Sequence, residues 1–112
     1  MATLTVQSIT ESGLDATYAN AASGGDTFAN DSERIFVHVK NSDSASHTVT
    51  VAADVSETTR PGFGVLQKND IYVAIPANEN RFIGPFPRDA FTNNPDIQYD
   101  AVTGVTIAAI KI

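Results

Sequence analysis

The feature that most constrains this chain is a period of two in the hydrophobic residues of segment 34–54. Successive side chains of a strand point to opposite faces, so an alternating pattern predicts a strand with one buried face. The first half of the segment places its β-branched residues on one such face: Ile35, Val37 and Val39. A second alternating run covers residues 48–53, after the small polar residues 41–46, which favour a turn. We therefore expect a β-hairpin at the centre of the fold.

Other alternating runs predict further short strands, separated by turn residues: 4–9, 70–76, 81–84, 97–99 and 104–112. Many short strands at regular spacing are typical of an all-β sandwich or barrel. We predict an all-β fold, a β-sandwich of short antiparallel strands in one domain over residues 1–112, with a jelly-roll-like order among the arrangements it allows. The expected core consists of Ile35, Val37, Val39, Val49, Val51, Ile71, Val73, Ile75 and Ile107.

The least regular part of the chain is segment 55–69. Pro61, Gly62 and Gly64 oppose one continuous strand there. The composition predicts an exposed loop, with Val65 and Leu66 turned back toward the core.

The charge balance excludes several classes of partner. The chain has 7 basic and 13 acidic residues and a net charge of −6. Sequence-independent binding to nucleic-acid phosphates or to an anionic membrane needs a basic surface, so neither nucleic acid nor membrane is expected as a partner. No segment is apolar over the length of a bilayer span, and residues 1–9 lack the features of a signal peptide, which indicates synthesis in a cytoplasm.

Residues that could carry chemistry are few. There is no cysteine, which excludes disulfides and thiolate chemistry, and no HExxH, GxSxG or P-loop pattern occurs. The histidines, His38 and His47, would form a metal or acid–base pair only if the fold brought them together; one half-buried and one exposed histidine is the favoured interpretation. Asp26, Asp31 and Glu33 flank one turn and have calcium-binding chemistry, but a solvated loop is favoured because the EF-hand pattern is missing. We expect no enzyme activity, no cofactor and no metal.

Aromatic and arginine residues in the irregular segments are the best candidates for a contact surface. These two residue types are enriched at protein interfaces. The alternative is that the aromatic residues cover the core of their own domain. The candidate capsid or subunit interface consists of Arg60, Phe63, Phe86, Arg88 and Phe91.

Four segments carry a resemblance to a known family: LTVQSITESGL, GGDTFANDSERIFVHVKNSDSASHTVTV, VAIPANENRFIGPFP and YDAVTGVTIAAIKI. The chain resembles the decoration, or cement, proteins of tailed-bacteriophage heads. The resemblance implies a β-rich homotrimer that binds the major capsid protein on the outer surface of the virion, at local three-fold positions, after synthesis in the host cytoplasm.

Two alternatives come from other classes. A carbohydrate-binding β-sandwich module would use exposed aromatic residues such as Phe63 or Tyr72, although the chain lacks tryptophan. A small hydrolase would need a catalytic motif that the sequence does not contain.

Overall fold

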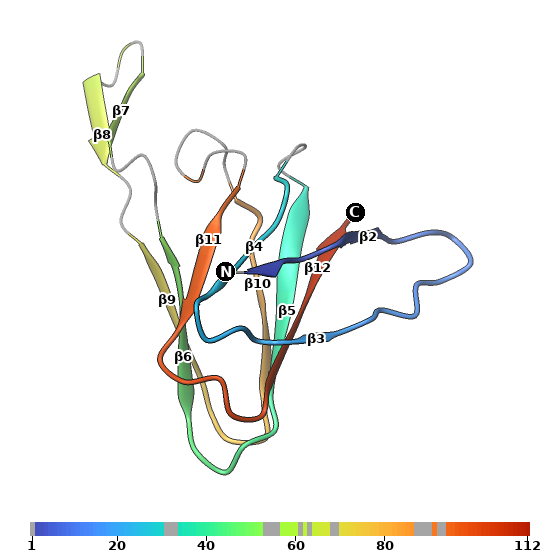
Figure 1. Cartoon of the computed structure of the whole chain (residues 1–112). Helices are drawn as coiled ribbons and strands as arrows, with labels where there is room; N and C mark the ends of the chain where they lie inside the picture. The colour runs from blue at the N-terminus through green and yellow to red at the C-terminus, as the bar shows by residue number, and fades with distance from the viewer. Residues whose placement is uncertain are drawn as a thin grey trace.

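The structure is a computed structural model that describes residues 2–30, 34–52, 57–60, 62, 64–67, 70–86, 91 and 94–112. Its main strands form two sheets that face each other (Figure 1). Sheet A has the strand order β1 (Ala2–Thr3), β4 (Asp26–Thr27), β11 (Asp96–Tyr99), β6 (His47–Ala52), β9 (Ile71–Ile75). Sheet B has the order β10 (Asn80–Ile83), β5 (Ile35–Asn41), β12 (Val105–Lys111), β2 (Val6–Ser8), with β3 (Ala19–Asn20) also paired to β12.

The order of the strands is that of a jelly roll. Eight strands follow one another along the chain: β3, β4, β5, β6, β9, β10, β11 and β12. Sheet B contains the first, eighth, third and sixth of these as neighbours, in the order β3-β12-β5-β10. Sheet A contains the second, seventh, fourth and fifth, in the order β4-β11-β6-β9. All six pairings among them are antiparallel. Two such sheets are the architecture of a double Greek key, so the prediction of an all-β sandwich is confirmed.

The predicted central hairpin is wrong, although both of its strands exist. β5 lies in sheet B and β6 in sheet A, so residues 42–46 cross from one sheet to the other. The reason is that alternation shows which face of a strand is buried and does not show which strand it pairs with. Two pairings outside the jelly roll, β1 with β4 and β2 with β12, are parallel rather than antiparallel.

The core lies between the sheets and matches the predicted set closely. Seven of the nine predicted core residues have no exposed surface: Ile35, Val37, Val39, Val49, Val51, Ile75 and Ile107. Ile71 and Val73 are partly buried and pack against this core, because β9 is the edge strand of sheet A. Each fully buried aliphatic side chain of this size stabilises the fold by roughly 1.5–3 kcal/mol relative to exposure.

Segment 55–69 contains two strands rather than only a loop. β7 (Glu57–Arg60) and β8 (Gly64–Gln67) pair with each other in a separate antiparallel hairpin. Figure 1 shows this hairpin projecting from one end of the sandwich, beyond β6 and β9. The side chains of Val65 and Leu66 lie outside the described residues. Among the residues that are described, no helix is long and apolar enough to cross a membrane.

Candidate functional site

Two residues predicted to lie at an interface are buried in the core. Phe86 and Phe91 have no exposed surface, and the ring of Phe86 lies 5.6 Å from the rings of both Phe28 and Phe91. A buried ring cannot present a contact surface, so these two residues are removed from the candidate interface. The prolines around Phe86 interrupt a strand, but the phenyl ring still provides apolar area that the sandwich buries. Arg60 lies in β7, and Phe63 and Arg88 lie outside the described residues.

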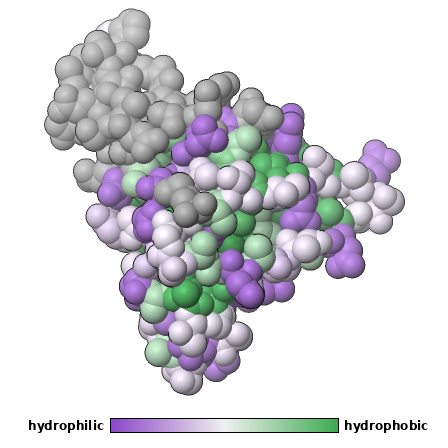
Figure 2. Space-filling model, in the orientation of Figure 1, coloured by the Kyte–Doolittle hydropathy of each residue, from purple (hydrophilic) through white to green (hydrophobic). Residues whose placement is uncertain are grey.

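The exposed aromatic surface lies elsewhere, on the outer face of sheet B. Phe82 of β10 is 66% exposed and Ile112 at the chain end is 68% exposed. With Phe36, Pro85 and Arg34 they line a groove of about 510 Å³, which we call the aromatic patch. Hydrophobic surface is visible in Figure 2 around the place where Figure 1 marks the C-terminus. Clustered apolar surface of this kind marks an interaction site more often than scattered exposed residues do.

The patch is held in place by packing on β5. The rings of Phe82 and Phe36 meet edge to face at 5.8 Å, and the ring of Phe82 stacks on His38 at 4.0 Å with an interplanar angle of 10°. This geometry follows from the register, since Phe82 pairs directly with His38 across the two strands. A ring fixed on both sides loses little rotamer freedom when a partner binds it.

His38 itself is a structural residue. It is only 8% exposed, and both ring nitrogens have partners: the Tyr18 hydroxyl at Nδ1 (2.6 Å) and the Asn80 side-chain oxygen at Nε2 (3.0 Å). The ammonium group of Lys40 lies 3.9 Å from the centre of the Tyr18 ring, a cation–π contact. This cluster anchors the segment before β3 to the outer face of sheet B, and it leaves His38 no free nitrogen for a metal or a substrate.

Charge is distributed unequally between the two sheets. The strands of sheet B contain Lys40, Arg81 and Lys111 and no aspartate or glutamate. Arg34 directly precedes β5, and Glu79, which pairs with Arg81 at 3.0 Å, directly precedes β10. The strands of sheet A contain two aspartates and no lysine or arginine. The aromatic patch therefore lies on the one sheet that lacks acidic residues, in a chain whose net charge is −6.

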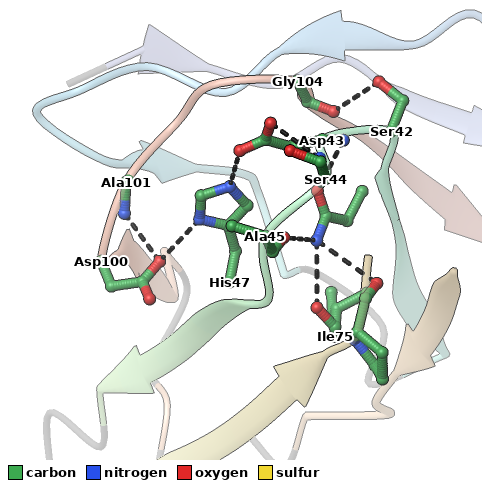
Figure 3. A network of polar contacts seen from close by, with 11 residues as sticks. Ser42, Asp43, Ser44, Ala45, His47, Ile75, Asp100, Ala101 and Gly104 are labelled. Carbon is green, nitrogen blue, oxygen red and sulfur yellow. Dashed lines mark hydrogen bonds and ion pairs between the residues drawn. The ribbon is translucent and has the colours of Figure 1, made fainter. Parts of the chain in front are cut away.

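A second polar cluster lies at the end of the sandwich where the sheets are joined by loops (Figure 3). His47, 6% exposed, lies between two carboxylates: its Nε2 is 2.8 Å from Asp43 and its Nδ1 is 3.3 Å from Asp100. Asp43 belongs to the loop after β5 and Asp100 to the loop after β11, so the imidazole links two crossings between the sheets. Gly104 allows the close approach, because a Cβ there would lie 2.9 Å from the backbone nitrogen of Asp43.

Asn41 connects a third loop to this cluster. It is 2% exposed, and its side-chain amide donates to the carbonyl oxygens of Ala45 (2.8 Å), Ile75 (3.0 Å) and Pro76 (3.3 Å). Its side-chain oxygen accepts the backbone N–H of Asp43 at 3.0 Å. The loops after β5 and β9 are thus cross-linked by one buried side chain, which donates to backbone carbonyl groups of both.

The electrostatics of the cluster favour a charged histidine. The hydrogen bond to Asp43 raises the pKa of His47, burial of the ring opposes this, and Asp100 adds to the increase. The same contact lowers the pKa of Asp43. Burial would raise the pKa of Asp100, but backbone hydrogen bonds at Thr48 and Ala101, together with His47, lower it. The cluster can hold a proton on the imidazole, and its groups already satisfy one another.

The two histidines are therefore both buried, which corrects the prediction of one half-buried and one exposed residue. Asp26 is also not in a solvated loop. It is fully buried, and its carboxylate accepts hydrogen bonds from the Tyr99 hydroxyl (2.6 Å) and the Ala22 backbone N–H (3.2 Å). Burial, followed by the contact with Asp26, raises the pKa of the Tyr99 hydroxyl. Asp31 and Glu33 lie outside the described residues, and within those described no group of three or more histidine or acidic side chains is arranged to hold a metal ion.

Comparison with known proteins does not assign the chain to a family. No protein-family model, no curated protein and no solved structure matches it.

Proposed function

We propose that this protein is a non-enzymatic virion structural protein that binds the outer surface of an icosahedral phage capsid and stabilises it. In this proposal it acts as a homotrimer, its partner is the major capsid protein, and it is located on the outside of the virion. The observation that carries the proposal is the aromatic patch: rigid, apolar surface on the outer face of a sheet. The jelly-roll order supports it by analogy, since this architecture recurs in viral capsid proteins.

The physical advantage of a trimer on a capsid is multivalency. A trimer at a three-fold position makes the same contact three times, and linked contacts gain roughly 10²–10⁴ in avidity over one contact. Matching symmetry is required, because each subunit must then present one repeated surface to one repeated neighbour. A protein that binds only the assembled shell stabilises that shell by mass action.

The direct test uses the phage that encodes this chain. Peptides of the chain should be found by mass spectrometry in purified virions. Added protein should sediment with heads that lack it, and those heads should then resist a higher temperature before they release DNA. Phe82→Ser should weaken this binding. The matched control is Ile9→Ser, because Ile9 is 48% exposed and does not line the groove. Virions without the chain, together with heads that do not bind it, would refute the proposal.

One observation favours the alternative function, a carbohydrate-binding module. Tyr72 of β9 is 68% exposed on the outer face of sheet A, where it pairs with Thr50, and an exposed ring beside hydroxyl groups can stack on a sugar. Jelly rolls are also found among lectins. Binding on a glycan array that Tyr72→Ala abolishes, without any binding to heads, would favour this second function.

A further inference from the structure

We infer that the free edge of strand β9 pairs with the same edge of a second copy of this chain, antiparallel and with Val73 on the two-fold axis. The pairing would join sheet A of the two copies into one continuous sheet. The inference goes beyond the proposed capsid role and does not depend on it, because β9 belongs to sheet A and the aromatic patch lies on sheet B.

The first observation is that β9 is an edge strand without the features that usually prevent pairing. It is the outermost strand of sheet A, and Figure 1 shows no strand beyond it. It pairs with β6 without a bulge, and Ile71–Ile75 contains no charged residue, proline or glycine. The other edge strands of the two sheets are very short, as in β1, β2 and β3, or end at charges and a proline, as in β10 with Arg81, Glu79 and Pro85. An unprotected edge is a template for pairing with another chain.

The backbone groups that β9 presents outward follow from the hydrogen bonds of β6. The carbonyl oxygen of Thr48 accepts the N–H of Asp100 at 3.1 Å, so the backbone of Thr48 points toward β11. Successive residues of a strand direct these groups to opposite sides, so the residues on either side of Thr48 bond to β9. The same alternation along β9 leaves the N–H and C=O groups of Tyr72 and Ala74 pointing away from β6. Within the described residues, no partner reaches these groups.

The side chains of β9 also leave apolar surface that a further strand would cover. Ile71 and Val73 face the core but are only partly buried, whereas Ile75 has no exposed surface. On the opposite face, the Tyr72 side chain is 68% exposed. A strand added at this edge would extend both faces of sheet A and bury part of this surface.

A second copy of β9 fits this edge because the strand complements itself. With Val73 on the axis, Tyr72 lies opposite the small Ala74 of the second copy, and these two residues exchange their free N–H and C=O groups. On the core face, Ile71 lies opposite Ile75 of the second copy, and cross-strand apolar pairs of this kind stabilise sheets. The contact brings no charged side chain of β9 against another, although the chain as a whole has a net charge of −6.

The symmetry of this contact differs from that of the proposed trimer. The same surface is used by both copies, so the contact is isologous and ends with two. On an icosahedral shell, two-fold axes lie between neighbouring three-fold positions, so β9 would link copies that belong to adjacent trimers. A contact along one strand of five residues is small, and we expect a weak dimer in free solution.

A single introduced thiol tests the register, since the chain has no cysteine. In Val73→Cys, the two thiols form a non-hydrogen-bonded pair across the axis, with Cα atoms about 4.5 Å apart. That separation lies inside the disulfide range of about 4.4–6.8 Å. In the control, Ala74→Cys, the two Cα atoms lie diagonally at about 7–8 Å, although this position is more exposed than Val73. Mild oxidation should convert Val73→Cys into a disulfide-linked dimer on a non-reducing gel and leave Ala74→Cys monomeric.

A pair of charge variants at Tyr72 tests whether the contact is between two copies of β9. Residue 72 of one copy and residue 72 of the other lie diagonally across the axis on the same face, within reach of long side chains. Tyr72→Lys and Tyr72→Glu, each combined with Val73→Cys, should therefore lose the disulfide-linked dimer through repulsion of like charges. An equimolar mixture should regain it, as a dimer with one chain of each kind by mass spectrometry. Circular dichroism melting checks that all variants are folded.

Three results would overturn the inference: Val73→Cys that stays monomeric on oxidation, Ala74→Cys that cross-links equally fast, or a mixture of the lysine and glutamate variants that regains no dimer. These outcomes are distinct from a failure of the capsid role. If the disulfide-linked dimer forms but virions lack the chain, the pairing of β9 stands and the capsid role fails. If the chain binds heads but Val73→Cys forms no dimer, the capsid role stands and the pairing fails.

Discussion

Replacing Phe86 by alanine should destabilise the protein strongly, because its ring fills the centre of an aromatic ladder between Phe28 and Phe91. The ring has no exposed surface and lies 5.6 Å from each neighbouring ring. Loss of burial alone removes roughly 1.5–3 kcal/mol. The two aromatic contacts and the cavity left behind bring the expected loss to about 3–5 kcal/mol. Domains of this size have a total stability of about 5–15 kcal/mol, so the variant loses a large fraction of it.

The measurement is urea unfolding followed by far-UV circular dichroism, since the chain has no tryptophan for fluorescence. The transition midpoint should fall while the slope with denaturant stays unchanged, which shows that stability changed and the unfolded state did not. Phe82→Ala is the matched control. Its ring is 66% exposed, so the free energy of unfolding should change by less than about 1 kcal/mol. Equal losses in the two variants would refute the assignment of Phe86 to the core and of Phe82 to the surface.

Two further predictions concern the polar cluster at the loop end. The pKa of His47 is raised above its unfolded value of about 6.5, so its contribution to stability is complete below that pH and is lost as the pH rises through the folded-state pKa. The pKa values of Asp43 and Asp100 are lowered, so their contribution is present above about pH 3.9 and is lost on further acidification. The melting temperature of the parent should therefore exceed that of His47→Gln most clearly between about pH 4 and 6.5; a difference that is the same at pH 6 and pH 9 would contradict this. Asn41→Ala should lower the free energy of unfolding by about 2–3 kcal/mol at any pH, because it leaves the backbone carbonyls of Ala45 and Ile75 without this donor. Urea unfolding at two pH values measures the size of this loss and shows whether it depends on pH.

The aromatic residues near residue 85 show what the local sequence does not predict in this protein. Phe82 and Phe86 are four residues apart, yet one is 66% exposed and the other has no exposed surface. Proline and glycine around them indicate only that the strand stops. Whether a ring beyond that point turns inward depends on the rings it can pack against, and for Phe86 these include Phe28, which is distant in sequence. The prediction of an aromatic contact surface therefore rests on residue type alone, whereas the structure buries Phe86 and Phe91 and exposes Phe82 and Tyr72.

The sequence by itself determined the fold class and the buried faces of the strands. Alternation is a local property, since neighbouring side chains of a strand must point to opposite sides, and so Ile35, Val37 and Val39 are identified as core residues without knowledge of any partner. Only the tertiary structure decided which sheet each strand joins. It also decided that His47 contacts carboxylates 4 and 53 residues away, and that the lysine and arginine residues in the strands of the two sheets all belong to sheet B. These features depend on pairing between distant segments. That pairing is set by the burial of all the strands together, and no single stretch of sequence specifies it.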